Sequence, residues 1–146
     1  MKNKFLVFLL PLVLFLAGCP KDAYRASAQA ADGVAQSVHS GIAVVQQLNA
    51  DGVLGDEEAV NIAVVLIDIN EANAMFIEAA KTIHKAGGGK AEYLVAARSV
   101  SVAVAGLNEA GVLHIKNAEA KARVQAVIVS IQASVDILIA AIEGAK

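Results

Sequence analysis

Few side chains in this sequence could do chemistry: one cysteine, three histidines and a group of polar residues at 47–58. His39, His84 and His114 are not spaced four apart, and no HExxH motif or second cysteine could complete a zinc site. The sequence has no nucleophile elbow or phosphate loop, because the glycines at 87–89 are not followed by Lys-Ser or Lys-Thr. We therefore predict that the protein is not an enzyme and uses no metal and no non-covalent cofactor.

The polar residues at 47–58 are spaced like the ligands of a calcium loop. Asn49, Asp51 and Glu58 fall at the third, fifth and twelfth places of a loop that resembles an EF-hand, with Gly52 at the sixth. Gln47 stands at the first place, where an aspartate normally supplies a hard ligand. The loop is thus an imperfect calcium candidate, and a calcium-regulated module is the weakest of three functional hypotheses.

The single cysteine ends an apolar leader. Lys2 and Lys4 form a basic start, and the uncharged run at 5–17 is short for a membrane span and typical of a secretory signal. Leu16-Ala17-Gly18-Cys19 then resembles the lipobox of bacterial lipoproteins. This resemblance covers residues 1–19 only. It implies that residues 1–18 are a cleaved signal peptide and that Cys19 carries diacylglycerol on its sulfur and an acyl chain on its nitrogen.

Lipidation at Cys19 would fix the location of the protein. Two or three acyl chains anchor a protein stably, whereas a single chain is marginal. In related sorting systems an aspartate after the cysteine retains lipoproteins in the inner membrane, and Pro20 stands here instead. The resemblance therefore implies a cell-envelope lipoprotein, on the outer membrane and facing the periplasm if the host is Gram-negative.

The charge balance bears on possible partners. Subtracting Lys2 and Lys4 from the twelve basic residues leaves ten against fourteen acidic ones in the mature chain. This acidic balance gives no reason to expect nucleic acid or strong attraction to anionic headgroups. Membrane attachment is therefore assigned to the lipid anchor.

A seven-residue motif occurs twice. LNADGVL starts at Leu48 and LNEAGVL starts at Leu107, which is an offset of 59 residues, and weaker matches continue on both sides. We interpret this as an ancestral duplication. A glycine just past a helix end adopts the left-handed conformation easily, and the next apolar residue then packs back on the helix. The motif therefore predicts a helix stop at Leu48, Gly52 and Val53, repeated at Leu107, Gly111 and Val112.

The segments around these stops predict helices. Apolar stripes at helical spacing cover 34–48, 62–83 and 124–142. Residues 99–104 alternate like a strand, but the repeat aligns them with a helical segment, so we predict a helix there too. Short connections favour antiparallel neighbours. The fold class expected is all-α: an antiparallel four-helix bundle built from a duplicated hairpin. Its parts are a lipid anchor and first hairpin (19–86), a glycine linker (87–89) and a second hairpin (90–146).

The chain is more apolar than one small bundle core requires. Between residues 124 and 142 the only charged side chain is Asp136, so Val129, Ile137 and the outward valines of the third helix should be exposed in a monomer. We predict a non-catalytic binding or scaffolding module that self-associates or contacts another envelope protein. The alternative is a carrier with a bundle cavity for a small apolar or lipid-like ligand.

Overall fold

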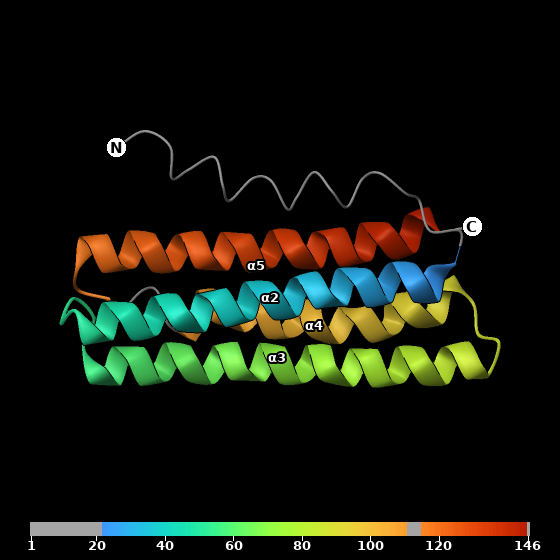
Figure 1. Ribbon diagram of the computed structural model, residues 1–146, viewed down its shortest axis with the longest axis horizontal. Helices are drawn as coiled ribbons and strands as arrows, with labels where there is room; N and C mark the ends of the chain where they lie inside the picture. The colour runs from blue at the N-terminus through green and yellow to red at the C-terminus, as the bar shows by residue number, and fades with distance from the viewer. Residues whose placement is uncertain (1–21, 111–114, 146) are drawn as a thin grey trace.

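A computed structural model describes residues 22–110 and 115–145, and within them the chain forms four long helices and no strand (Figure 1). The helices are α2 (Ala23–Ala50), α3 (Asp56–Lys85), α4 (Lys90–Ala110) and α5 (Ala118–Gly144). Each helix runs opposite to the one before it, as Figure 1 shows. The all-α bundle predicted from the sequence is confirmed.

The four helices form a ring. α2 packs against α3 and α5, and α4 packs against the same two helices from the other side, so α2 and α4 are diagonal. The contact between α2 and α5 is the most extensive, and the contact between α4 and α5 is the least extensive of the four neighbouring pairs. One end of the bundle gathers the starts of α2 and α4 with the ends of α3 and α5 (Figure 1).

Local sequence explains where the helices begin. The Asp22 carboxylate accepts from the Tyr24 amide at 2.9 Å, and the Asn117 side chain accepts from two amides of the first turn of α5. Three acidic residues occupy the first turn of α3, where the helix dipole favours negative charge. These caps satisfy amides that have no partner within the helix.

The predicted apolar stripes form the core. Buried positions recur at spacings of three and four along α2, α3 and α5, and they include Val34, Leu48, Leu66, Phe76 and Ile131. Residues 99–104 lie in α4, with Val100 and Val104 buried, so the helical interpretation of that segment is confirmed. Val102, which lies between these two valines in the sequence, is 72% exposed, so the alternation of serine and valine does not correspond to alternating buried and exposed faces.

Small residues bring α2 and α5 together. A Cβ added at Gly41 would lie 2.6 Å from Cγ1 of Val127, so the glycine allows a close approach of α5. The hydroxyls of Ser37 and Ser134 lie 2.7 Å apart and hydrogen-bond across the same interface.

A buried polar contact joins α3 to α2. Asn73 is a buried polar residue on α3 whose amide nitrogen donates to the Ala31 carbonyl of α2 at 3.0 Å. These contacts hold the neighbours in register.

Candidate functional site

The first turn of the bundle contains the calcium candidate, and its polar side chains are tied to the turn itself. The Asn49 amide donates to the Leu54 carbonyl at 3.2 Å and to the Asp56 carboxylate at 2.8 Å. The Gln47 amide donates to the Asp51 carboxylate at 2.8 Å. Each of these bonds joins the end of α2 to the turn or to the start of α3, so the cluster fixes the hairpin.

Glu58 is held by backbone donors. One carboxylate oxygen accepts from the Gly55 amide at 2.9 Å and the other accepts from the Lys116 amide at 3.2 Å. These hydrogen bonds to Gly55 and then Lys116 hold the pKa of Glu58 below its ordinary value. The carboxylate therefore joins the first turn to the segment before α5, and in the described residues no group of three His, Cys, Asp or Glu is placed to hold a metal ion.

The backbone at Gly52 has the geometry of a Schellman stop. Gly52 has a φ of 68°. Its amide donates to the Asn49 carbonyl, and the Val53 amide donates to the Leu48 carbonyl, both at 2.9 Å. These two hydrogen bonds satisfy carbonyls that would otherwise have no donor at the end of the helix.

The remaining predicted site residues fall partly or wholly outside the described range. Leu107 lies in α4, three residues before that helix ends at Ala110, and nothing is described of its side chain. Gly111, Val112 and Cys19 lie outside the described residues. The second helix stop and the lipidation site therefore stay predictions.

The histidines are not brought together. The His84 ring stacks on the Tyr24 ring, with centroids 4.3 Å apart and planes inclined by 16°. This stack pairs the end of α3 with the start of α2. His39 lies fifteen residues further along α2, which is roughly 22 Å at the rise of a helix. His114 lies outside the described residues.

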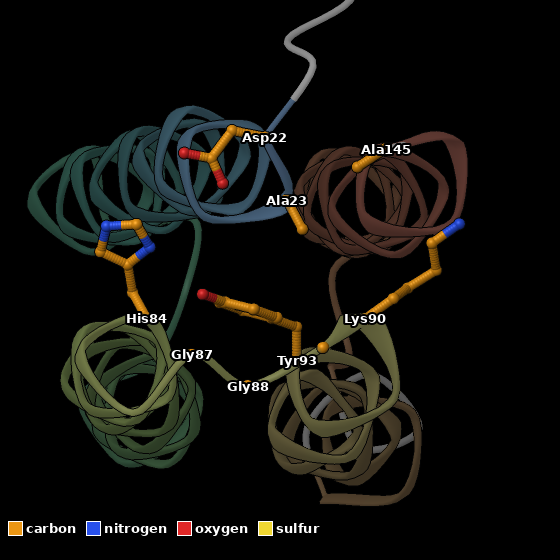
Figure 2. A pocket seen from close by; sticks show the side chains of 9 residues that line it. Asp22, Ala23, His84, Gly87, Gly88, Lys90, Tyr93 and Ala145 are labelled. Atoms are coloured by element: carbon orange, nitrogen blue, oxygen red, sulfur yellow. The ribbon is translucent and has the colours of Figure 1, made fainter.

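A cavity of about 530 Å³ opens at the end of the bundle that carries the start of α2 (Figure 2). Its polar side chains are Asp22, His84, Lys90 and Tyr93, which come from α3, α4 and the residue that caps α2. The rest of the lining is small: the glycines at 87–89 and two alanines. The Lys90 ammonium also donates to the Glu143 carbonyl at 2.7 Å, which links α4 to the end of α5.

Tyr93 forms part of the inner wall of this cavity. Its side chain is 2% exposed, and in Figure 2 its hydroxyl points toward the His84 side of the opening. Burial, and then the negative charge of Asp22, raises the pKa of the Tyr93 phenol. Sequence reasoning treated residues 87–89 only as a break and missed the cavity. The signal available was a run of three glycines between two helices that each carry an aromatic residue near the break.

Several large apolar side chains face outward. Within the described residues they lie on α3, α4 and α5, and the most exposed are Val102 at 72%, Met75 at 69% and Val95 at 65%. Val129 is 62% exposed and Ile137 is 37% exposed, as the sequence predicted for a single bundle. Val60, Val64 and Ile67 form a stripe on the first half of α3. These side chains give three helices an apolar outer surface.

Two of the helices have the length and apolar character of membrane spans. On composition alone, α3 and α5 could each cross a bilayer. In the most apolar 18-residue window of each helix, 28% of the residues are buried in the bundle. α3 carries Asp68 and Glu71 in its middle, and α5 carries Asp136, and such charges are costly at the centre of a bilayer. Both helices are therefore compatible with membrane association only in this weak sense.

No protein-family model matches the chain, and neither a curated protein nor a solved structure matches it.

Proposed function

We propose that this protein is a membrane-anchored lipoprotein of the bacterial cell envelope, and that its four-helix bundle is a non-catalytic binding or scaffolding module that self-associates. The observation that carries the scaffolding role is the exposure of large apolar side chains on three helices, with Val95 and Val102 more than 60% exposed on α4 alone. Apolar surface of this kind is usually covered by a partner, a second copy or a membrane.

The anchoring rests on the leader. Only two residues separate the lipobox-like segment 16–19 from Asp22, which caps the first helix. A bundle attached by so short a segment stays close to the bilayer, and its exposed side chains then meet other proteins of the same membrane. Confinement to one surface raises the effective concentration of such partners.

Lipidation is tested by growing cells on an alkyne-tagged fatty acid and comparing the wild-type chain with Cys19→Ser. We expect the tag on the wild-type protein and its recovery in the membrane fraction, with both lost in the variant. Equal tagging of the two proteins, or a wild-type protein without the tag, would contradict the anchor.

Self-association is tested by placing a photo-crosslinking residue at Val102, which is exposed and apolar, and as a matched control at Ser40, which is exposed on α2. We expect a crosslinked dimer of the chain from position 102 and none from position 40. A crosslink from position 102 to another envelope protein would replace self-association by a hetero-complex and keep the scaffolding role. Equal crosslinking from both positions would remove the argument from the apolar surface.

The alternative function is a carrier of a small apolar or lipid-like ligand. The cavity at the end of the bundle favours it, because its volume of about 530 Å³ would hold a small molecule or part of a larger one. A saturable rise in the melting temperature of the protein with lipid-like ligands, and no dimer in cells, would favour the carrier over the scaffold.

A further inference from the structure

One outer face of the bundle lies between α4 and α5. α5 turns Val127 and Ser134 toward α2. The opposite flank of α5 faces α4, and there the Lys90 ammonium of α4 donates to the Glu143 carbonyl at 2.7 Å. Figure 2 shows the Lys90 side chain running along the outside of the bundle from α4 toward α5. We call the solvent side of this contact the α4–α5 face.

Exposed side chains repeat every seven residues along the α4–α5 face. On α4 they stand at positions 91, 98 and 105, beginning beside Lys90, and on α5 at positions 122, 129, 136 and 143, ending at Glu143. Next to them lie positions 95 and 102 on α4 and positions 126, 133 and 140 on α5. Most of these residues are valine or alanine. Val95, Val102 and Val129 are three of the four most exposed large apolar side chains in the described residues, so the face is mainly apolar.

In the middle of this face each helix carries one charged side chain. Arg98 is the only charged residue between positions 93 and 107, and Asp136 is the only one between positions 124 and 142. Eight residues along α4 from Lys90, and seven residues back along α5 from Glu143, are both a rise of about 11 Å, so Arg98 and Asp136 lie at nearly the same height. Within the described residues the only ion pair is that of Lys81 with Glu78, so Arg98 and Asp136 do not pair with each other in one chain.

A second copy of the chain fits these charges in one of two symmetric arrangements. With a two-fold axis parallel to the helices, α4 of each copy faces α5 of the other, and residues of equal height meet. Arg98 of each copy then faces Asp136 of the other copy, so the interface contains two opposite-charge pairs. With a two-fold axis perpendicular to the helices and at this height, Arg98 would face Arg98 and Asp136 would face Asp136, which is repulsive.

We propose that the chain forms a parallel two-fold dimer through the α4–α5 face, with Arg98 of each copy paired to Asp136 of the other and the exposed valines packed around these pairs. This inference rests on the proposed self-association and identifies its surface and its partner, a second copy of the chain. The proposed lipid anchor fits the same arrangement, because the parallel axis places both open ends, and the anchors next to them, on the same side of the dimer.

Other surfaces and other occupants fit less well. The second apolar stripe, Val60, Val64 and Ile67 on α3, is followed by Asp68 and Glu71, so two copies of that surface would bring charges of one sign together. The hydrocarbon of a bilayer offers no partner for Arg98 or Asp136, and charged side chains are costly there. A second copy supplies the opposite charge to both residues.

Charge reversal tests the pairing. The full lipidated protein, labelled at its C-terminus with a donor or an acceptor fluorophore, is placed in vesicles of ethanolamine and glycerol phospholipids, and energy transfer is followed as the protein is diluted in the lipid. Arg98→Glu and Asp136→Arg should each weaken the dimer roughly tenfold, because two attractive pairs become repulsive. The double variant should return to within roughly twofold of the wild-type chain, which a variant that merely misfolds would not do.

The matched control for charge reversal is Arg123→Glu. Arg123 is exposed on α5 four residues before Val127, and it therefore lies toward the α2 side of that helix. It changes the net charge as much as Arg98→Glu does, and it should leave the dimer unchanged. An equal loss of energy transfer in Arg98→Glu and Arg123→Glu would overturn the pairing, because the effect would then come from net charge.

Cysteine crosslinking tests the direction of the two copies. Ala105 lies seven residues after Arg98, and Val129 lies seven residues before Asp136, so the parallel axis brings position 105 of one copy to position 129 of the other. Two differently tagged chains, one with Ala105→Cys and one with Val129→Cys, are produced in the same cells and treated with a mild oxidant. We expect a disulfide between the two different chains. Disulfides only between like positions would overturn the parallel arrangement.

The outcomes separate this surface from the proposed function. A dimer that is equally stable in Arg98→Glu, with the crosslink from position 102 retained, would overturn the charge pairing and leave self-association in place. A wild-type chain without energy transfer at any dilution would overturn self-association and this surface with it, and labelling of Val102 by a bilayer-soluble photoprobe would then assign the face to the membrane. A disulfide dimer of the wild-type chain, whose single cysteine is Cys19, would contradict the lipid anchor alone.

Discussion

At one end of the bundle α2 stops at Gly52, and at the other end α3 stops at Gly87. The two glycines have φ values of 68° and 70°. In each stop the glycine amide donates three residues back and the next amide donates five residues back, to Leu48 in the first case and Ile83 in the second. The two helices therefore end by the same Schellman geometry.

The residues that come after the two stops differ. Gly52 precedes Val53 and Leu54, and the Leu54 side chain is 1% exposed and fills the end of the core. Gly87 precedes two more glycines, which have no side chain to place there, and a cavity of about 530 Å³ remains. The stop sets the direction of the chain, and the residues after it decide whether that end of the bundle is closed.

The two copies of the repeated motif lie at corresponding places in the bundle, as the predicted duplication requires. Each copy of the LNxxGVL motif starts within the last turn of a helix, at Leu48 in α2 and at Leu107 in α4, and both helices run toward the same end of the bundle (Figure 1). The link between the copies, at 87–89, falls at the open end beside the first and last described residues of the bundle. The first turn thus closes one end of the bundle with Leu54, and the link at 87–89 leaves a cavity at the other end.

The largest expected effect comes from removing the side chain that closes the first end. Leu54→Ala should lower the free energy of unfolding by about 2–5 kcal/mol, because a buried leucine is lost and the helices cannot fully fill the space. Urea unfolding followed by circular dichroism measures this. Val64→Ala, at a residue that is 50% exposed on α3, is the matched control and should change the value by less than about 0.5 kcal/mol. Similar effects in the two variants would show that Leu54 does not close the core.

The second effect compares the two stops directly. Gly52→Ala and Gly87→Ala should each lower the free energy of unfolding by about 1–2 kcal/mol, because alanine is strained at positive φ. An added Cβ meets no atom within 4 Å at either site, so the strain is in the backbone alone and the two costs should match. Unequal costs, measured by the same unfolding experiment, would mean that the surroundings of the two stops contribute to their stability.

Much of the fold could be predicted because helix periodicity and stop chemistry are local. Val34, Leu66, Ile131 and their neighbours recur at helical spacing, and they fill the core. The polar contacts inside the bundle could not be predicted in the same way. Asn73 donates to Ala31 across two helices, and the pairing of these positions depends on the register of α2 against α3, which no single stretch of sequence contains.

The candidate sites also depend on contacts that a single stretch of sequence does not contain. The spacing of Asn49, Asp51 and Glu58 resembles a calcium loop, because a helix stop and a metal loop both use short polar side chains around a glycine. In the structure these side chains hydrogen-bond within the hairpin, and Glu58 also accepts from Lys116 in the segment before α5. The end cavity is assembled from Asp22 and three later segments of the chain, so it depends on tertiary packing. Only the glycine run at 87–89 marks it in the sequence.

The third prediction is that the open end is sensitive to alkaline pH. Burial raises the pKa of Tyr93 above that of an unfolded tyrosine, which is about 10. The stability that the neutral phenol contributes is therefore fully present below pH 10 and is lost as the pH rises through the folded pKa. Tyr93→Phe has no such proton to lose, so the variant should lose less stability than the wild-type chain between pH 8 and pH 11. If urea unfolding shows the same loss of unfolding free energy in the wild-type chain and in Tyr93→Phe over this pH range, a buried phenol at the open end is contradicted.

The smallest expected effect is at the closed end and has the opposite pH dependence. Backbone hydrogen bonds lower the pKa of Glu58, so its contribution to stability is present above the pKa of an unfolded glutamate, about 4.3, and is lost as the pH falls through the folded pKa. Glu58→Gln removes this titration, so the free energy of unfolding of the variant should fall less than that of the wild-type chain as the pH is lowered below about 4.3. Glu57→Gln, in the same first turn, is the control, because its carboxylate makes neither of these hydrogen bonds. If both variants reduce the acid-induced loss of unfolding free energy equally, the helix dipole causes the effect, and the hydrogen bonds that join Glu58 to Gly55 and Lys116 do not.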